Sequence, residues 1–424
     1  MCDPPVLRLN SARGEAESPD IGDPPGTVDN TVGLGRPLCP TLLIDDPEPV
    51  PCPLDPPDLD PGVDRNPDPL GLFAQLMARR GVEVIRDRGR FAGPNAVTVG
   101  RETLEAKHIV IATGSAPRRL PFPGAELMIT SDDVLSERKL PASVVFVGGG
   151  VIALEFSHVY ARAGVAVTIL EMLPRLLGNM EADAVAQLHA ETERIGVAIH
   201  TGVEVRRIER AGDRLRVVYE EGGSERVAEA ERVVNGAGRV ANVNGLDLVT
   251  GQVQAEQQRI ALDEHLRSTS NRVVYACGDT VAEHAQLSPI ATYEGRIVGR
   301  NIVDGAKRTP DYTGIASCVF TVPALASVGL TQAAAEQQGI DLSVAVNDMR
   351  EWLSGRTYAL SAAWSKVLID KKTDRILGAH LFGHAGEELI HIFALAIKHR
   401  ITATELRDFV YGFPTFSADI KSML

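Results

Sequence analysis

The sequence has few cysteines, few aromatic residues and no long apolar run. Its cysteines show neither a CxxC nor a CxxxxC spacing, so they indicate neither a disulfide framework nor a zinc ribbon. They are Cys2, Cys39, Cys52, Cys277 and Cys318. Aromatic residues make up 5%, and no apolar stretch approaches the roughly 20 residues that a membrane-spanning helix needs. The N-terminus has no basic stretch followed by an apolar block, so we expect a cytoplasmic protein that neither spans a membrane nor is secreted.

Basic charge is also scarce. The net charge is −13, from 43 Lys and Arg against 56 Asp and Glu, which argues against nucleic acid or anionic lipid as the main partner. Much of the excess lies in the first 70 residues, which hold 14 acidic and 4 basic residues and 16 of the 26 prolines. Proline removes backbone donors and fixes φ. Residues 1–68 are therefore predicted to be an acidic, irregular leader, for which a spacer is favoured over a functional site.

The rest of the chain has a globular pattern. Its 424 residues, 44% hydrophobic, suffice for two or three domains. Helical spacing begins near residue 70, and strand patterns follow at 82–85, 96–99 and 108–112. The succession recurs, because residues 196–199 repeat the pattern of 81–84 and residues 230–239 that of 106–115. After residue 310, strand-rich stretches lead to a helix at 386–399, which predicts a separate α+β module.

The strongest motif is a βαβ unit with a GxGxxA turn. A buried-type strand at 143–147 leads into the glycine turn and a helix that ends at Gly164, and a second strand follows at 165–170. Gly148 makes the tight turn, Gly150 lets the backbone approach a pyrophosphate, and the small Ala153 permits close helix–strand packing. The helix N-terminus offers free N–H groups to phosphates. The predicted dinucleotide-binding residues here are Gly148, Gly149, Gly150, Val151, Ile152 and Ala153.

An acidic residue ends the second strand of this unit. Glu171 stands 23 residues after Gly148, where a carboxylate accepts hydrogen bonds from ribose hydroxyls and repels a 2′-phosphate. NAD is therefore favoured over NADP. Arg175 leaves NADP open, since an arginine there could accept the phosphate. A glycine-rich turn without a ligand is the weaker alternative, because strand, helix, small third residue and acid all agree.

Two further patterns carry less weight. The segment Gly33–Leu38 matches GxGxxx, but no apolar strand precedes it and Pro37 and Pro40 exclude the helix that should follow, so it is rejected. The histidines and glutamates at His384, Glu387, Glu388 and His391 have ligand-like spacing on one helical face. A packed helix is favoured over a metal site there, and no metal is expected.

A third turn follows the strand at 273–276. Gly278 and Asp279 lie at the C-terminal end of this strand, where Asp279 could accept a hydrogen bond from a hydroxyl group of a bound cofactor. The same residue could instead cap the next segment, so both interpretations stay open from spacing alone.

At these residues the chain resembles the two-dinucleotide-binding-domain flavoprotein reductases of the pyridine nucleotide-disulfide oxidoreductase family, which includes glutathione reductase, dihydrolipoamide dehydrogenase and mercuric reductase. The resemblance runs from about residue 70 to 424, with the motifs in family order. They are Ala112–Gly114, the Gly148 turn, Gly238–Arg239, Gly278–Asp279, Phe320–Thr321 and Ser327–Leu330.

The resemblance implies an α/β fold with two dinucleotide-binding Rossmann-like domains, the first truncated, plus an α+β dimerisation domain. It implies a remnant FAD-binding domain at 69–122 and 263–306, an NAD-binding domain at 123–262, a dimerisation domain at 310–424, and a homodimer. Asp279 would bind the FAD ribityl chain, and Glu155 would lie beside the flavin N5 as a catalytic residue, normally paired with a lysine. The other implied cofactor-binding residues are Thr113, Gly114, Gly238, Arg239 and Gly278.

The chain departs from the family at both ends. The first βαβ unit, the CxxxxC redox disulfide and the lysine should lie before residue 70, and the disulfide motif and the FAD-type turn are not found there. The typical His-Pro-Thr-x-x-Glu near the C-terminus is replaced by Phe413-Pro414-Thr415-Phe416-Ser417-Ala418. Phe413 cannot exchange a proton, and Ala418 cannot orient a histidine. The C-terminal cysteine pair of mercuric reductase is also absent.

Two hypotheses follow. The first is an NAD(P)H-dependent, FAD-containing oxidoreductase in which hydride passes from NADH to flavin and then to an unidentified small-molecule acceptor, without the redox disulfide and the His-Glu pair. The alternative is a catalytically inactive remnant that binds NAD and dimerises without flavin. The leader motivates the alternative, because it resembles sequence read from a displaced start or a wrong frame. Family-like FAD residues in another frame of the coding DNA would support that explanation.

Overall fold

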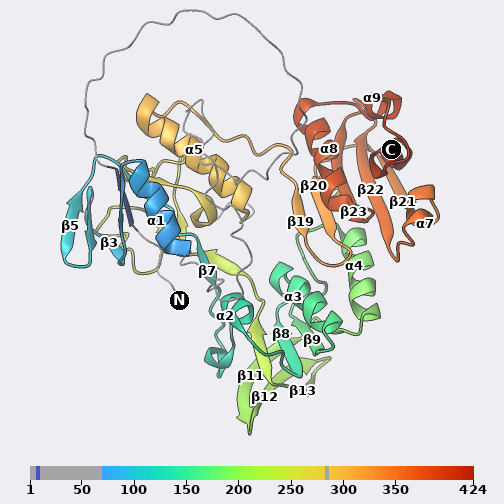
Figure 1. The fold of residues 1–424 in the computed structure, drawn as a ribbon, viewed down its shortest axis with the longest axis horizontal. Helices are drawn as coiled ribbons and strands as arrows, with labels where there is room; N and C mark the ends of the chain where they lie inside the picture. Colours follow the sequence, from blue (N-terminus) through green and yellow to red (C-terminus); the bar gives the residue numbers. More distant parts are fainter. Residues whose placement is uncertain (1–5, 10–68, 282–285) are drawn as a thin grey trace, which may run out of the picture. The chain divides into compact units, whose positions relative to one another are not determined.

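The computed structural model describes residues 6–9, 69–281 and 286–424, which form two compact units (Figure 1). Unit 1 consists of the described residues up to Ser115 together with Ala241–Pro310. Unit 2 consists of Ala116–Val240 and Asp311–Leu424. The Gly33–Leu38 motif lies outside the described residues. None of the described helices is both long and apolar enough to cross a membrane.

Unit 1 combines small sheets with two longer helices. β3, β4 and β5 form an antiparallel sheet, and β6 and β18 pair in parallel. Its elements are β1 (Val6–Leu9), α1 (Pro69–Arg79), β2 (Val82–Ile85), β3 (Gly89–Gly93), β4 (Ala96–Val99), β5 (Glu102–Glu105), β6 (Ile109–Ile111), β16 (Ala255–Glu256), β17 (Arg259–Ile260), β18 (Val274–Ala276), the 3-10 helix η2 (Gly278–Thr280) and α5 (Ser288–Asp304).

The structure of unit 1 differs from two expectations drawn from the sequence. Val6–Leu9, placed in an irregular leader, is strand β1 and pairs antiparallel with β2. These four residues include no proline, so each can join the backbone ladder. Residues 241–262, assigned from sequence to the NAD-binding domain, belong to unit 1. The reason is packing, because Val253 and Ile260 share a buried apolar cluster with Phe91.

The first half of unit 2 is built on a parallel sheet in the order β10-β9-β8-β14. The strand, turn, helix and second strand predicted around Gly148 are confirmed as β8, α3 and β9. The elements are β7 (Ser115–Pro117), η1 (Ala125–Leu127), α2 (Ser131–Ser136), β8 (Ser143–Val147), α3 (Val151–Arg162), β9 (Ala166–Glu171), α4 (Ala182–Arg194), β10 (Ala198–Thr201), β11 (Glu204–Ala211), β12 (Arg214–Glu221), β13 (Ser224–Ala230), β14 (Arg232–Asn235) and β15 (Arg239–Ala241).

The second half of unit 2 is the predicted α+β module. Five antiparallel strands lie in the order β19-β20-β23-β22-β21, and α8 covers β20 and β23 (Figure 1). The elements are β19 (Ser317–Val319), β20 (Leu325–Gly329), α6 (Gln332–Gln337), β21 (Leu342–Asp348), α7 (Leu353–Thr357), β22 (Ala363–Asp370), β23 (Ile376–Gly383), α8 (Gly386–His399), α9 (Ala403–Asp408), η3 (Phe416–Asp419) and α10 (Ile420–Met423). The mixed α/β fold class is thereby confirmed.

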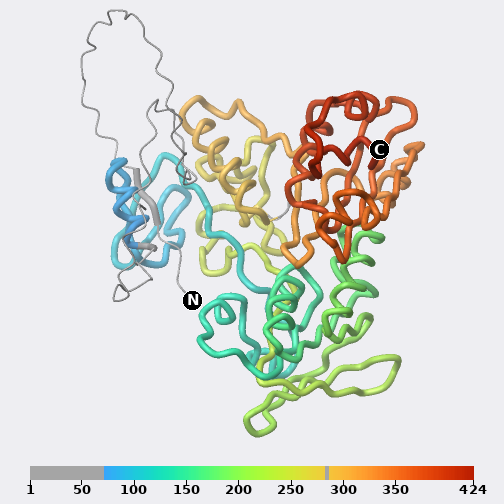
Figure 2. Tube along the Cα trace, turned by 45° about the vertical axis from the view of Figure 1, so that its right-hand side comes forward, coloured from blue at the N-terminus to red at the C-terminus, as the bar shows by residue number. Residues whose placement is uncertain are grey.

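The two halves of unit 2 share one buried core. α4 packs on β20, β22 and β23, so the half with the parallel sheet lies directly against the five-stranded sheet (Figure 2). Leu188 of α4 and Trp364 and Phe382 of the sheet belong to the same apolar cluster. A movement of one half relative to the other would have to open this core.

Candidate functional site

The glycine turn after β8 is closely packed against the loop after β14. Gly148 has a φ of 101°, in the left-handed region, and a Cβ there would lie 2.6 Å from the Ala237 Cα. A Cβ at Gly236 would lie 3.0 Å from the Cβ of Ala153, which is fully buried. Small residues are therefore required at the first and third fingerprint positions, because the turn is tight and the helix packs closely against the strands.

The helix that follows presents its N-terminus without a side-chain cap. Gly150 is the N-cap residue of α3 and makes no side-chain hydrogen bond there. Val151, the first helical residue, is 41% exposed, and Ile152 is partly exposed. Unpaired N–H groups and the helix dipole favour an anion at such an end. Together with the glycine turn, this geometry fits the pyrophosphate of a dinucleotide.

The acidic residue at the end of β9 lies beside this turn. The Glu171 carboxylate accepts hydrogen bonds from the backbone N–H of Gly149 and from that of Leu173, the latter at 2.6 Å. The two bonds hold the carboxylate next to the fingerprint, and the residue remains partly exposed. Ionised carboxylate oxygens have further acceptor capacity, so Glu171 can also accept hydroxyl groups.

The arginine that left NADP open is engaged elsewhere. The Arg175 guanidinium donates to three backbone carbonyl groups of the loop that follows it. They belong to Leu177 (3.3 Å), Gly178 (2.6 Å) and Met180 (3.0 Å). In this arrangement the Arg175 guanidinium is bound to carbonyl groups of its own loop.

The predicted flavin-side residues come together in unit 1. The loop after β6 and helix η2 after β18 lie at the same edge, because their parallel strands are neighbours. The Gly114 N–H donates to Thr280 Oγ1 at 3.0 Å, and Thr113 Oγ1 donates to the Asn242 carbonyl at 2.7 Å.

Asp279 lies at this edge between Gly278 and Thr280. Its Oδ2 accepts a hydrogen bond from the Ser115 hydroxyl at 3.0 Å. This bond connects the residue that follows β18 with the loop that follows β6. Gly278 has a φ of 73°, and its N–H donates to Glu294 at 2.7 Å. The carboxylate thus lies at the carboxyl ends of two parallel strands, where α/β sheets bind ligands.

The remaining predicted residues lie in unit 2. Gly238 has a φ of 93°, its carbonyl accepts the Arg118 N–H at 3.0 Å, and Arg239 begins β15. Glu155 lies on α3, and its Oε1 accepts the backbone N–H of Phe320 at 2.8 Å. Sequence reasoning did not connect Glu155 with the β19–β20 loop, which lies 165 residues away in the chain.

A second contact to the same loop was missed. His158 is 1% exposed, and its Nδ1 accepts the Val322 N–H at 3.2 Å. The signal was present, because Glu155, His158 and Arg162 share one helical face through spacings of three and four residues. The spacing of these residues does not show which segment of the chain this face of α3 contacts.

The resemblance compares Phe413 with the family's histidine and Ala418 with its glutamate. Phe413 is 75% exposed, and Ala418 is buried, with its N–H donating to Thr415 Oγ1 at 3.2 Å. His384 instead bonds Asp419 at 2.9 Å. Within the described residues, no group of three or more His, Cys, Asp or Glu side chains could hold a metal ion.

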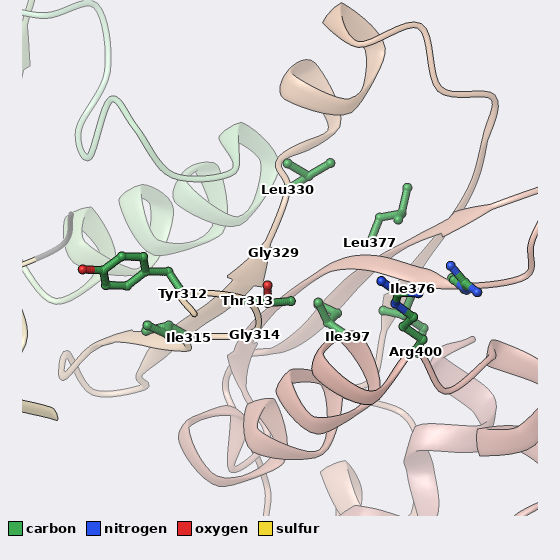
Figure 3. Close-up of a pocket in the computed structure, with 11 residues that line it drawn as sticks. Tyr312, Thr313, Gly314, Ile315, Gly329, Leu330, Ile376, Leu377, Ile397 and Arg400 are labelled. Carbon is green, nitrogen blue, oxygen red and sulfur yellow. The ribbon is translucent and has the colours of Figure 1, made fainter. Parts of the chain in front are cut away.

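A separate hollow of about 420 Å³ lies in the C-terminal half (Figure 3). Its walls are mostly apolar, from residues such as Ile315, Leu330 and Ile397, and the exposed Arg375 and Arg400 also line it. None of its lining residues belongs to the predicted cofactor-binding set.

Comparisons with known proteins agree with this geometry. The sequence model described as pyridine nucleotide-disulphide oxidoreductase matches residues 62–295, and that of the dimerisation domain of the same family matches residues 315–424. The chain belongs to the pyridine nucleotide-disulphide oxidoreductase family. Glutathione reductase of Burkholderia cepacia is 32% identical over 357 residues, 83% of this chain and 78% of the relative. Dihydrolipoyl dehydrogenase of Mycobacterium tuberculosis H37Rv is 31% identical over 356 residues, 82% and 76% of the two chains.

Two solved structures share the fold. The HOCl-induced flavoprotein disulfide reductase RclA from Escherichia coli has a TM-score of 0.73 at 24% identity, covering 80% of this chain and 78% of its own. LpdA from Mycobacterium tuberculosis has a TM-score of 0.73 at 25% identity, covering 84% and 79%. Membership of the family supports an NAD(P)H-dependent FAD flavoprotein with a dimerisation domain. The alternative of a remnant without flavin is not favoured, since the family match includes both chain segments of unit 1.

Proposed function

We propose that this protein is an NADH-dependent flavoprotein oxidoreductase that passes electrons from NADH through FAD to an acceptor other than a CxxxxC disulfide of its own chain. The observation that carries the proposal is the Gly148 turn. Backbone at Gly148 and Ala237 approaches too closely for a side chain, and the uncapped α3 N-terminus lies next to Glu171. This is the set of features that dinucleotide recognition requires.

The preference for NADH rests on two side chains. Glu171 is held beside the turn by two backbone N–H groups, so its charge would repel a 2′-phosphate. Arg175, the cation that could offset this repulsion, is bound to the carbonyl groups of its own loop. Both observations favour a ribose with free hydroxyl groups.

The residues of unit 1 fit half of a flavin site. Thr113, Gly114 and Asp279 meet at the carboxyl ends of β6 and β18, where a carboxylate can accept hydroxyl groups of the ribityl chain. By resemblance to the family, Glu155 would be the protein group beside the ring. A bound flavin supplies the redox chemistry of the enzyme, and the chain supplies binding and orientation.

The described cysteines do not offer an activated thiol. Burial raises the pKa of Cys277 to about 11, with a further contribution from Glu294. Burial also raises the pKa of Cys318, as do Glu387 and Glu388. A thiol of raised pKa is a poor nucleophile at neutral pH. Since Phe413 also cannot exchange a proton, we propose a reaction that uses neither a redox disulfide nor a His-Glu pair.

The test is the visible absorption spectrum of the purified, desalted protein. We expect oxidised flavin at close to one per chain, bleached by NADH under anaerobic conditions and more slowly by NADPH. Protein that is colourless and takes up no FAD on incubation would contradict the proposal. If NADPH bleached the flavin faster than NADH, the preference for NADH that rests on Glu171 would be overturned. The proposal of a flavoprotein oxidoreductase would still stand.

A further inference from the structure

Three side chains of α3 hold one loop of the C-terminal half. Glu155 accepts the Phe320 N–H at 2.8 Å, His158 Nδ1 accepts the Val322 N–H at 3.2 Å, and the Arg162 guanidinium donates to the Val322 carbonyl at 2.6 Å. The loop therefore makes successive backbone hydrogen bonds to the helix whose N-terminus carries the glycine turn. Glu155 and His158 thus bind the same loop two residues apart, at Phe320 and at Val322.

The hydrogen bonds of His158 define its protonation. Because Nδ1 accepts the Val322 N–H, the proton of the neutral ring lies on Nε2. Nε2 then donates to Thr192 Oγ1 at 2.9 Å, and Thr192 donates to the Leu188 carbonyl at 2.7 Å. His158 and Thr192 are 1% and 0% exposed. Burial lowers the pKa of His158 to about 4, which keeps the ring neutral at physiological pH.

The loop is not held by burial of its large side chains. Phe320 is 67% and Val322 57% exposed, and only Thr321 between them is buried, at 3%. Exposed apolar side chains contribute little to the position of the backbone that carries them. The backbone bonds to α3 therefore have a large part in fixing where the Phe320 N–H lies.

We propose that His158 is a positioning residue for Glu155: its imidazole holds the loop so that the Phe320 N–H stays on the Glu155 carboxylate. The inference rests on the proposed function for the role of Glu155 at the flavin. The described hydrogen bonds of His158 run to Thr192 and Val322, neither of which belongs to the glycine turn or to the predicted cofactor residues. A change at His158 should therefore alter the turnover number and leave nucleotide affinity nearly unchanged.

The loop can be observed directly with Phe320→Trp, since only the backbone of Phe320 is used and its side chain is exposed. In full-length protein with this reporter tryptophan, His158 is changed to Leu, Gln or Asn. Asn places an acceptor near the Nδ1 position and can bind the Val322 N–H. Gln can reach Thr192 but cannot bind the loop. Leu makes neither hydrogen bond. Acrylamide quenching of the reporter tryptophan is measured against the same variants with Phe320, which corrects for the two native tryptophans.

We expect quenching of the reporter tryptophan to rise about twofold in the Leu and Gln variants and to return to the His158 value in Asn, because a lost hydrogen bond shifts a local equilibrium severalfold. In protein with Phe320, the kcat for NADH oxidation with an artificial acceptor should fall about tenfold in Leu and Gln and recover in Asn, with KM for NADH within about twofold.

Equal quenching in all four proteins would overturn the proposal. It would also be overturned if Asn behaved like Leu, or if KM for NADH rose in step with the fall in kcat, since a general packing defect would have these effects. Circular dichroism confirms that each variant is folded. The quenching measurement needs no flavin, so it still tests the inference if the proposed function fails.

Discussion

Lys366 and Glu181 form a buried ion pair at the junction of the two halves of unit 2, with the Nζ and Oε1 atoms 2.8 Å apart and both side chains less than 5% exposed. Lys366 lies on β22 and Glu181 immediately precedes α4. Lys366 also donates to Asp183 at 2.6 Å, and Glu181 accepts the Gln332 N–H at 2.8 Å. The charges are thus fully paired where the half with the parallel sheet meets the five-stranded sheet.

Removing one partner of this pair should be far more damaging than removing both. Burial lowers the pKa of Lys366, but its hydrogen bonds with Asp183 and Glu181 outweigh this and raise it, so the amine stays charged. We expect Glu181→Leu to lower the free energy of unfolding by roughly 3 kcal/mol, because Lys366 loses its buried partner and keeps only Asp183, whose side chain is 60% exposed. Urea denaturation followed by circular dichroism measures this.

The exposed pair of Lys398 and Asp311 provides the matched control. Its atoms lie 3.1 Å apart with both side chains more than 40% exposed, so Lys398→Met should change stability by less than about 1 kcal/mol. The double variant Glu181→Leu with Lys366→Met should recover much of the lost stability. A double variant as unstable as the single one would show that the charge is not the cause.

The charge at Glu171 should determine nucleotide affinity. Glu171→Arg removes the acceptor for ribose hydroxyl groups and introduces a cation, so we expect NADH to bind at least about tenfold more weakly and NADPH to gain relative to it. Titration of intrinsic NADH fluorescence gives both dissociation constants. Glu102→Arg, an exposed change on β5, should leave them unaltered. Unchanged NADH affinity in Glu171→Arg would remove the basis for the NAD assignment.

Local pattern explains what the sequence could predict here. The β8–α3–β9 unit and the roles of Gly148 and Ala153 depend on residues within 30 positions of one another, where periodicity and turn chemistry are informative. The contact of Glu155 with Phe320 and that of Lys366 with Glu181 span 165 and 185 residues, and no local pattern specifies which segments meet. The predicted domain boundary at 262 differs from the division into compact units for the same reason, since residues 241–262 pack in one apolar cluster with Phe91 of unit 1.

Gly148 should tolerate no side chain, for reasons beyond its backbone angle. In Gly148→Ala the new Cβ would lie 2.6 Å from backbone atoms of Ala237, in addition to the strain of a φ of 101°. Gly202 has a φ of 69° with open space around its Cβ position, so Gly202→Ala measures the strain alone, about 1–2 kcal/mol. We expect Gly148→Ala to lose clearly more stability than this and to bind NADH more weakly. Thermal and urea unfolding measure both variants. If Gly148→Ala and Gly202→Ala lost the same stability, the close approach of Gly148 to Ala237 would be contradicted.

Acid should weaken the folded state through His158. The unfolded histidine titrates near 6.5, whereas burial lowers the pKa of the folded residue to about 4. Between these values the unfolded chain binds a proton that the folded chain does not, so the free energy of unfolding rises with pH and falls as pH decreases. The stability from this residue is complete above about pH 6.5, and roughly 3 kcal/mol of it should be lost by pH 4.

The measurement is the urea midpoint of wild type and of His158→Asn at intervals from pH 7 to pH 4. Asn does not titrate, so the difference between the two curves isolates His158 from the other acid-sensitive groups. The charged groups that face it, Arg162 on α3 and Glu191 on α4, are present in both proteins. Wild type should lose stability faster than the variant as pH falls. Parallel curves would mean that His158 has the same pKa in the folded protein as in the unfolded chain. The Val322 N–H would then lose its acceptor on the ring as soon as the pH falls below that pKa.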